Sequence, residues 1–481
     1  MGLFENIRIH GVLVEKRRPS LAGLAMGGFI MRQTFILLSF SAACLHLTFE
    51  ICKESESLKM AYVRADMGSP LAYGPVRLLV QMARSVDVEE RGHRFLNGDI
   101  SDLCLGKPAV RWIPATATVS DAVTALKRSG ETHVSVWTCD NNTNESCECV
   151  GKICMTDVIC FLCREENLAN PLKAFEAPIS EILPKGSSIV RHLGPNSSLL
   201  EAIDCILEGT QNLVIPIQNH RSTFSRKKFP NKLASLDSKY CKASEYCWLT
   251  QEDIVRFLLN SVGVFSPIPG MTIESLHLIQ HDIMTIHYLD PASSALDYIS
   301  RSLTKQTSVA VIDKDNRLIG EISPVTLACC DEIVAAAIST LSAGDLMAYI
   351  DCGGPPEYLV ELVKIRLEER NFVAMLELME EFSNSSISSS SSSCSSDDES
   401  GSSFHGSLGR NSTARRSEAI ICYPWSSLVA VMFQALAHRV SCVWVVEEDH
   451  TLVGTVTFAG ILKVFRSIAG VNPKRETSFK Q

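Results

Sequence analysis

Apolar positions recur with helical spacing at four places along the 481-residue chain. In the first, Val119, Ala122, Val123 and Leu126 stand at i, i+3, i+4 and i+7, which places them on one face of a helix. Ser or Thr near the start of each segment is typical of a helix N-cap, where the hydroxyl satisfies free N–H groups. The pattern predicts four amphipathic helices, which begin near Thr116, Pro195, Pro291 and Pro424.

A strand-like segment follows each predicted helix. Each is a nearly continuous run of β-branched and other apolar residues, as expected for strands that are buried on both faces. A second strand and a closing turn come next, and each turn leads into another helix. The apolar runs begin at His133, Asn212, Ser308 and Ser441, and the closing turns begin at Gly151, Cys247, Gly320 and Gly454. One such unit of about 60 residues buries little apolar surface, so we expect the units to pack in pairs, sheet against sheet.

Composition narrows the classes of function. The net charge of −9 argues against nucleic acid as a partner, because binding to a phosphate backbone needs a basic surface. Many of the 18 cysteines stand alone or inside apolar helical stretches, which predicts reduced thiols and no metal site. The chain shows no sequence motif of a phosphate-binding loop, a serine hydrolase or a zinc protease. No catalytic residues are therefore predicted, and we expect a protein that is not an enzyme.

The four units resemble CBS domains, whose β-α-β-β-α repeats pair into Bateman modules. The order of the motifs and the segment around Cys329 and Cys330 are similar to the plant CBS-domain-containing proteins of the CBSX group. These have four repeats and are similar to the gamma subunit of AMP-activated protein kinase. The resemblance implies an α+β fold with two Bateman modules. It places repeat 1 at 98–165, repeat 2 at 178–263, repeat 3 at 274–338 and repeat 4 at 341–470.

Two repeats carry insertions. Repeat 2 contains a basic loop, 219–244, which is either a solvated loop or a docking site for an acidic partner. Repeat 4 is split by residues 353–418, where a helix is predicted from Glu357 to about Phe382. A Ser-rich tract follows, and we expect it to be disordered because it buries no apolar area.

The resemblance also identifies candidate ligand residues. In CBS domains the closing turn is a nucleotide clamp: a Ser or Thr hydroxyl is followed three residues later by a carboxylate that accepts hydrogen bonds from a ribose. Repeat 2 keeps both groups, as Thr250 and Asp253, whereas repeat 1 keeps Asp157 and has Cys154 in place of the hydroxyl residue. Repeats 3 and 4 have Thr326 and Gly460 in place of the carboxylate. A carboxylate in the first turn of a helix is also favoured by the helix dipole without any ligand.

The remaining expectations concern the surroundings of the clamp in repeat 2. Its apolar walls are predicted to come from Ile189, Val190, Ile215 and Pro216. The candidate cations for a ligand phosphate lie nearby in the sequence and are Arg191, His192 and Arg256. The implied regulatory ligand is AMP, ADP, ATP or S-adenosylmethionine, and no other cofactor is expected.

The resemblance implies a regulatory protein that modulates a partner protein, such as the subunits of a kinase complex or a redox enzyme. An interaction scaffold with degenerate nucleotide sites is the alternative. The N-terminal extension, 1–97, contains an apolar run at 33–49, which is shorter than the roughly 20 residues of a membrane span. It is read as a membrane anchor, a targeting peptide or an extension without function. We expect a cytoplasmic or nuclear protein, with an organelle or a membrane as the alternative.

Overall fold

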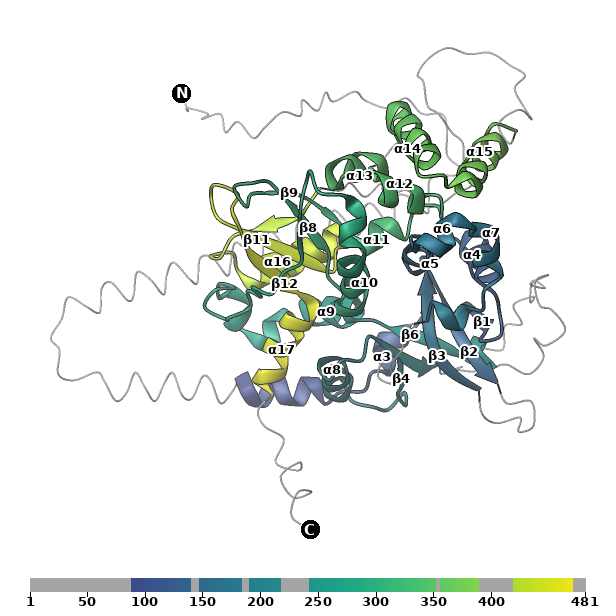
Figure 1. Ribbon diagram of the computed structural model, residues 1–481. Helices are drawn as coiled ribbons and strands as arrows, with labels where there is room; N and C mark the ends of the chain where they lie inside the picture. The colour runs from purple at the N-terminus through teal and green to yellow at the C-terminus, as the bar shows by residue number, and fades with distance from the viewer. Residues whose placement is uncertain are drawn as a thin grey trace, which may run out of the picture. The chain divides into compact units, whose positions relative to one another are not determined.

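The computed structural model describes residues 88–139, 147–183, 190–217, 242–351, 355–388 and 418–469 (Figure 1). All of these residues belong to one unit, Leu79–Gln481. The apolar run 33–49, nearly all of the basic loop and most of the Ser-rich tract lie outside the described residues. Within them, no helix combines the length and the apolar character needed to cross a membrane.

The described residues form four three-stranded sheets, one in each repeat, and all four have the same topology. Each leading strand pairs in parallel with the second strand, which pairs antiparallel with the third. The helix between the first two strands provides the crossover that a parallel pair requires. The predicted α+β fold with CBS repeats is confirmed.

The elements of each repeat follow one order: strand, helix, strand, strand, helix. Repeat 1 consists of β1 (Trp112–Pro114), α4 (Val119–Ser129), β2 (His133–Cys139), β3 (Cys147–Cys154) and α5 (Met155–Leu162). Repeat 2 consists of β4 (Val190–His192), α8 (Leu199–Leu207), β5 (Asn212–Pro216), β6 (Tyr246–Leu249) and α9 (Gln251–Asn260). Repeat 3 consists of β7 (Thr285–His287), α10 (Leu296–Lys305), β8 (Val309–Ile312), β9 (Leu318–Ile322) and α11 (Pro324–Leu327). Repeat 4 consists of β10 (Ile421–Cys422), α16 (Leu428–His438), β11 (Cys442–Val446), β12 (Leu452–Thr457) and α17 (Phe458–Ile468).

Hydroxyl N-caps start the first long helix in three of the four repeats. Thr118, Ser198 and Ser427 each accept a hydrogen bond from the backbone N–H three residues later. In repeat 3 a 3₁₀ turn, η5 (Ala292–Ala295), comes before α10, which has no side-chain cap. The reason is local: the Ser294 hydroxyl donates to the Pro291 carbonyl oxygen at 2.6 Å, so it caps no helix.

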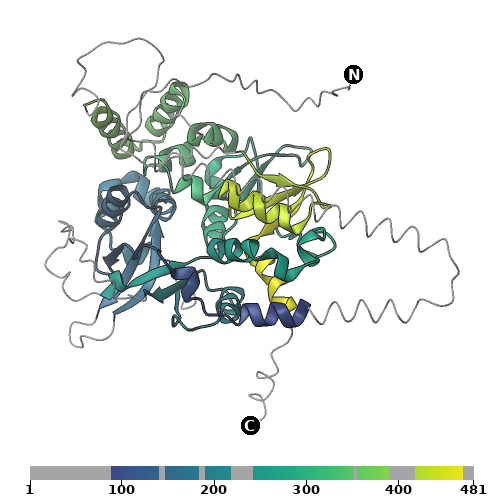
Figure 2. The same cartoon turned by 180° about the vertical axis from the view of Figure 1, so that it is seen from behind.

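The repeats pair through their sheets into two modules. Trp137 and Val214 belong to one buried cluster that joins the sheets of repeats 1 and 2, which form module 1. Ala310 and Trp444 belong to another that joins the sheets of repeats 3 and 4, which form module 2. The two modules contact each other through helices, because one large core unites repeats 1 and 3 and a second unites repeats 2 and 4. Figures 1 and 2 show α8 of repeat 2 beside α17 of repeat 4.

Ion pairs accompany both contacts between the modules. The Lys127 ammonium lies 2.7 Å from the Glu332 carboxylate, which connects repeats 1 and 3. The Arg466 guanidinium lies 2.5 Å from the Asp204 carboxylate, which connects repeats 2 and 4. These side chains are largely covered, so the attraction is less screened than at an open surface.

The insertion in repeat 4 differs from its prediction. The single helix predicted from Glu357 to Phe382 is wrong: the segment forms α14 (Glu357–Glu369) and α15 (Val373–Ser388). The chain turns at Asn371, whose φ of 60° is left-handed and ends a helix. The turn lets α14 pack on α12 (Val334–Thr340), while α15 reaches α6 (Glu165–Ala169) and α7 (Pro171–Glu176), which follow repeat 1.

Candidate functional site

The clamp of repeat 2 is built at the junction of β6 and α9. Thr250 is the N-cap of α9, and its hydroxyl oxygen accepts a hydrogen bond from the Asp253 backbone N–H at 3.2 Å. The Thr250 N–H and hydroxyl in turn donate to Asp253 Oδ2, at 2.8 and 2.6 Å. The two predicted clamp residues therefore lie side by side. The same bonds form a capping box, which holds them in place whether or not a ligand is bound.

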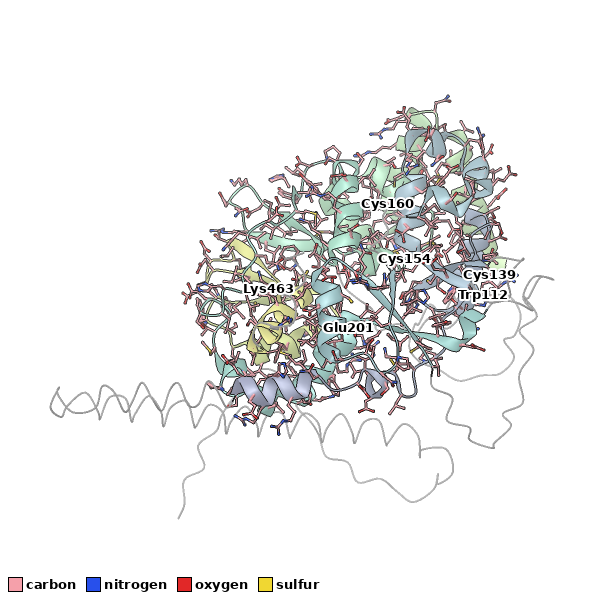
Figure 3. All side chains as sticks on the ribbon, turned by 90° about the horizontal axis from the view of Figure 1, so that it is seen from below. Trp112, Cys139, Cys154, Cys160, Glu201 and Lys463 are labelled. Atoms are coloured by element: carbon pink, nitrogen blue, oxygen red, sulfur yellow. The ribbon has the colours of Figure 1, made fainter. Side chains whose placement is uncertain are left out.

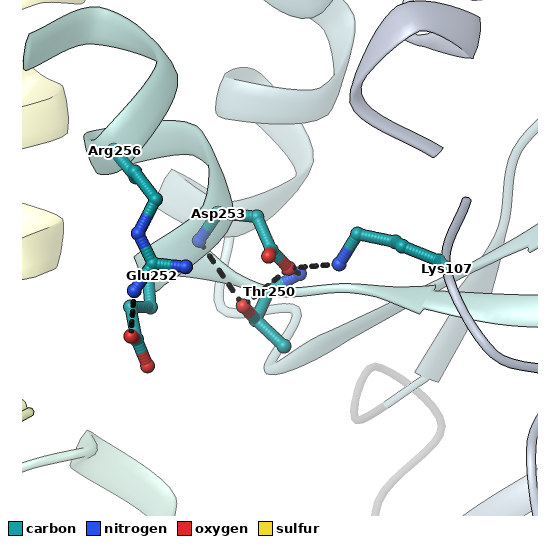
Figure 4. Close-up of polar contacts among 5 residues, drawn as sticks. All are labelled: Lys107, Thr250, Glu252, Asp253 and Arg256. Carbon is teal, nitrogen blue, oxygen red and sulfur yellow. Dashed lines mark hydrogen bonds and ion pairs between the residues drawn. The ribbon is translucent and has the colours of Figure 1, made fainter. Parts of the chain in front are cut away.

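A third polar group completes this clamp. The Lys107 ammonium donates to Asp253 Oδ2 at 2.5 Å, and the two side chains are 20% and 22% exposed (Figure 4). Every bond to the carboxylate reaches Oδ2, so Oδ1 accepts no hydrogen bond from the described residues. Lys107 belongs to residues 98–111, which precede β1 and are called here the lead segment of repeat 1.

Lys107 was not predicted from the sequence as a clamp residue, and it lies 146 residues before Asp253. Its partner is set by the pairing of sheets within module 1, which brings the lead segment of repeat 1 to the clamp of repeat 2. The Val110 N–H donates to the Tyr246 carbonyl oxygen at 2.9 Å and holds the segment beside β6. The one available signal was the expected sheet-to-sheet pairing of units.

Two of the predicted apolar walls lie on opposite faces of the sheet of repeat 2. Val190 packs in the cluster between the two sheets, whereas Ile215 is fully buried in the helical core on the other face of its sheet. Pro216 is half-buried at the end of β5, and Ile189 lies outside the described residues. Because β5 has apolar side chains on both faces, its sequence does not indicate which face would contact a ligand.

The cations sought near the clamp have other partners. The Arg191 guanidinium donates to the Glu208 carboxylate at 3.1 Å, and Arg256 donates to Glu252 at 2.5 Å one turn before it on α9 (Figure 4). His192 packs edge-on against Trp137, with ring centroids 5.8 Å apart, and burial lowers the pKa of its imidazole. Among the described residues, the cation that is paired with the Asp253 carboxylate is Lys107, which was not one of the three candidates.

In repeat 1 the two clamp positions, Cys154 and Asp157, are likewise joined by the hydrogen bonds of a helix cap. The Cys154 N–H and thiol both donate to Asp157 Oδ2, at 2.8 and 3.0 Å. Burial raises the pKa of the Asp157 carboxyl and lowers the pKa of the neighbouring Lys152 ammonium. Cys154 lies at the turn between β3 and α5, and Cys160 lies on α5 (Figure 3). No cluster of potential metal ligands is found in the part of the chain that the structure describes.

The clamp of repeat 4 opens onto a cavity of about 390 Å³, within the size range of small-molecule sites. Thr457 is the N-cap of α17, and its hydroxyl oxygen accepts a hydrogen bond from Gln280 Nε2 at 3.1 Å. Gln280 belongs to residues 274–284, which precede β7 and are called here the lead segment of repeat 3. Thr307 lines the cavity and is 8% exposed, and its buried hydroxyl has no hydrogen-bond partner among the described residues.

Lys107 and Gln280 occupy equivalent positions. The carbonyl oxygens of Arg111 and Met284 accept equivalent bonds, from Ser135 N–H at 2.8 Å and from Ala310 N–H at 2.9 Å. Lys107 and Gln280 stand four residues before Arg111 and Met284. By the same alignment, His133 and Trp248 of module 1, whose ring centroids are 6.0 Å apart, correspond to the cavity-lining Ser308 and Thr455 of module 2.

The chain is similar to several proteins of known sequence or structure. No family model matches the chain. The chain is 46% identical over 384 residues to the CBS domain-containing protein CBSX5 of Arabidopsis thaliana, an alignment that covers 77% of this chain and 97% of that protein. It is 21% identical over 395 residues to the SNF1-related protein kinase regulatory subunit gamma-like PV42b of the same plant, covering 78% and 96%. A crystal structure of protein MJ1225 from Methanocaldococcus jannaschii aligns with 76% of this chain and 99% of its own, at 16% identity and a TM-score of 0.45.

Proposed function

The chain belongs to the CBS-domain-containing CBSX proteins, and on that basis we propose that it is a non-catalytic regulator with an adenosine-binding clamp at Thr250 and Asp253. AMP, ADP, ATP and S-adenosylmethionine are the candidate ligands, because each carries the ribose that such a clamp binds. A ligand regulates by binding two conformations of the protein with different affinity. The bound chain would then alter the activity of a partner protein.

The observation that carries the proposal is the set of polar groups at this clamp. Asp253 Oδ1 accepts no bond from the described residues, and Oδ2 is shared with Lys107 and Thr250. A ribose diol needs two acceptor sites, which the carboxylate provides once the Lys107 ammonium moves away. The ammonium is then available to a ligand phosphate, a charge-assisted contact that offsets the loss of its ion pair.

A thermal-shift screen with the four ligands tests binding directly, since a ligand of the folded state raises the unfolding midpoint. The ligand that raises the midpoint is then titrated by calorimetry. Asp253→Ala removes the ribose acceptor and is expected to cost about 1–3 kcal/mol, roughly 10- to 100-fold in affinity.

A matched control separates the loss of the cap from the loss of the ligand acceptor. Asp121 closes the same kind of capping box with Thr118 on α4, away from the clamp, with a bond of 3.0 Å from the Thr118 N–H. Asp121→Ala is expected to lower stability by a similar amount and to leave ligand affinity unchanged. Equal affinity in the wild type and Asp253→Ala would contradict the assignment of the clamp.

The partner is proposed as a kinase complex or a redox enzyme. The relative PV42b is named as a gamma-like regulatory subunit of a protein kinase, which supports the kinase. Co-purification of the full chain with kinase subunits, with and without ligand, tests this part. The redox enzyme rests on the resemblance to CBSX proteins alone.

An interaction scaffold without a nucleotide is the second candidate. It is favoured by the hydrogen bonds that close both clamps from within, Lys107 with Asp253 and Gln280 with Thr457. The thermal-shift screen distinguishes the two candidates, because a scaffold with degenerate sites shows no midpoint change with any of the four ligands.

A further inference from the structure

Two buried thiols meet beside the clamp of repeat 2. Cys104 ends α3 (Ser101–Cys104) in the lead segment of repeat 1, and Cys247 lies in β6, three residues before Thr250. Helix α3 packs against β6, which brings the side chains of Cys104 and Cys247 together. Cys104 is 8% exposed and Cys247 is fully buried, and both belong to the core that unites repeats 2 and 4. The two cysteines are far apart in the sequence, because most of repeat 1 and a large part of repeat 2 lie between them.

Cys247 stands at a position that is glycine in the other three repeats: Gly151, Gly320 and Gly454. At Gly454 an added Cβ would lie 2.6 Å from the Gln280 carbonyl oxygen of the lead segment, and at Gly151 it would lie 2.7 Å from Leu183 Cδ2. The lead segment of repeat 1 is bonded to β6 at another point, since the Val110 N–H donates to the Tyr246 carbonyl oxygen, and α3 brings Cys104 beside Cys247. The pair is thus specific to the module whose clamp keeps its carboxylate.

The two thiols differ in electrostatic environment. The pKa of the Cys247 thiol is lowered, because it accepts the hydrogen bond of Cys104 and lies near the Lys107 ammonium. The pKa of the Cys104 thiol is raised by its hydrogen bond to Cys247 and by burial. Burial raises the pKa of Cys422, in the same core, to about 12. Since the thiolate is the reactive form, Cys247 is the nucleophile of the pair and Cys104 is placed to resolve it.

We propose that Cys104 and Cys247 are a redox modification site, at which a peroxide forms a reversible disulfide that fastens the lead segment of repeat 1 onto repeat 2. In the first step the Cys247 thiolate attacks one peroxide oxygen, the O–O bond breaks, and a sulfenic acid forms. The departing hydroxide takes the Cys104 proton and becomes water. In the second step the Cys104 thiolate attacks the Cys247 sulfur, the S–O bond breaks, and the leaving hydroxide is protonated from solvent. Two thiols lose two electrons in all, and the peroxide is reduced to two waters.

The disulfide has a consequence for the clamp, and this consequence rests on the proposed function. Lys107 is three residues from Cys104 and is paired with Asp253. A covalent link at Cys104 restricts the movement that takes the ammonium away from the carboxylate. The oxidised chain is therefore expected to bind an adenosine ligand more weakly, by at least about tenfold, and a thiol reductant restores the affinity.

The full-length chain is titrated with hydrogen peroxide, a small oxidant suited to buried thiols. Remaining thiols are blocked with N-ethylmaleimide, and the chain is digested without reductant for mass spectrometry. The expected product is a linked peptide pair containing Cys104 and Cys247, which dithiothreitol separates. Amide hydrogen exchange across residues 98–107 is expected to slow in the oxidised chain and to recover on reduction.

Variants assign the roles. In Cys104→Ala, Cys247 is expected to be labelled by dimedone, a sulfenic-acid reagent, and no linked pair forms. Cys422→Ala removes a buried thiol from the same core and is expected to form the linked pair as the wild type does. Thermal unfolding of the reduced variants shows that they are folded, and the wild-type peptide map decides the chemistry independently of any variant.

Three results would overturn the proposal. The first is full alkylation of Cys104 and Cys247 at a peroxide dose that oxidises the exposed Cys329. The second is a linkage of either residue to a different cysteine, and the third is a linked pair with unchanged exchange across 98–107. If AMP binds neither the reduced nor the oxidised chain, the proposed function fails, while the peptide map and the exchange data still decide the disulfide. Equal AMP affinity in both states overturns the closure of the clamp.

Discussion

The clamps of repeats 2 and 4 occupy equivalent places in modules 1 and 2 and share an N-cap threonine, Thr250 and Thr457, but the polar groups around it differ. In module 1 a carboxylate, Asp253, is paired with an ammonium, Lys107. In module 2 a glycine, Gly460, replaces the carboxylate, and the neutral amide of Gln280 donates to Thr457. The side chain that closes each clamp therefore matches the residue it meets: a cation faces an anion, and an amide faces a hydroxyl.

The side chains beside the two clamps also differ in size. The rings of His133 and Trp248 lie together in module 1, whereas Ser308 and Thr455 leave a cavity of about 390 Å³ in module 2. Module 1 thus keeps the clamp carboxylate and has two rings beside it, whereas module 2 has smaller hydroxyl residues there and lacks the carboxylate. The duplicated repeats have therefore diverged both in the clamp itself and in the side chains that lie beside it.

The largest expected effect is at the position that is glycine in repeat 4, Gly454, and cysteine in repeat 2, Cys247. Gly454→Ala places a Cβ 2.6 Å from the Gln280 carbonyl oxygen, within the pair of backbone bonds that joins Gln280 and Thr455. The backbone must shift, and we expect a loss of about 3 kcal/mol in the free energy of unfolding. Cys247→Ala at the equivalent position of module 1 keeps its Cβ and is expected to cost about 1 kcal/mol. Denaturant unfolding of both variants measures the difference.

Gly194→Ala is the control, since an added Cβ there meets no atom within 4 Å. Its stability is expected to equal that of the wild type. A Gly454→Ala variant as stable as Gly194→Ala would show that the lead segment of repeat 3 does not run against β12, and the contrast between the modules would be lost.

The second effect concerns His133, whose ring lies beside Trp248 in module 1. Burial, followed by the nearby Lys152 ammonium, lowers the pKa of His133 to about 3, from an ordinary value of 6.5. Between pH 6.5 and 3 the unfolded chain binds a proton that the folded chain does not, so stability falls as the pH falls. At pH 5 the loss is about 2 kcal/mol relative to pH 7. Denaturant titrations at the two pH values measure it.

His133→Ser introduces the residue that module 2 has at this position. It is expected to reduce the difference between pH 7 and pH 5 by most of this amount. His438→Ser removes an exposed histidine from the end of α16 and is expected to leave the difference as in the wild type. An unchanged pH dependence in His133→Ser would place the imidazole in water rather than against Trp248.

The features that the sequence predicted well are local. Thr250 and Asp253 are three residues apart, so their approach follows from the first turn of one helix, and the caps at Thr118 and Ser198 follow in the same way. The four repeats were recognisable because each carries the same order of short-range patterns. These patterns describe a single repeat, and each of the four repeats has the predicted order of helices and strands.

The features that the sequence did not predict depend on how units meet. Lys107 reaches Asp253 only because two sheets pack face to face, and no property of residues 98–111 names that partner. The predicted walls Val190 and Ile215 lie on opposite faces of their sheet, and β5 is apolar on both faces, where periodicity does not distinguish the sides. The break at Asn371 depends on the separate surfaces against which α14 and α15 pack.

The smallest effect compares the two contacts that close the clamps. A double-mutant cycle with Lys107→Met and Asp253→Asn measures the coupling of the ion pair, and a cycle with Gln280→Met and Thr457→Val measures that of the neutral hydrogen bond. Because the ion pair is about four-fifths covered, we expect about 1 kcal/mol for it, and about half as much for the amide. The loss of each helix cap cancels within its own cycle. One molar salt screens charges and should reduce only the first coupling. Equal couplings with equal salt dependence would mean that charge does not distinguish the clamps, and that the carboxylate of repeat 2 is retained as a helix cap rather than as a ligand group.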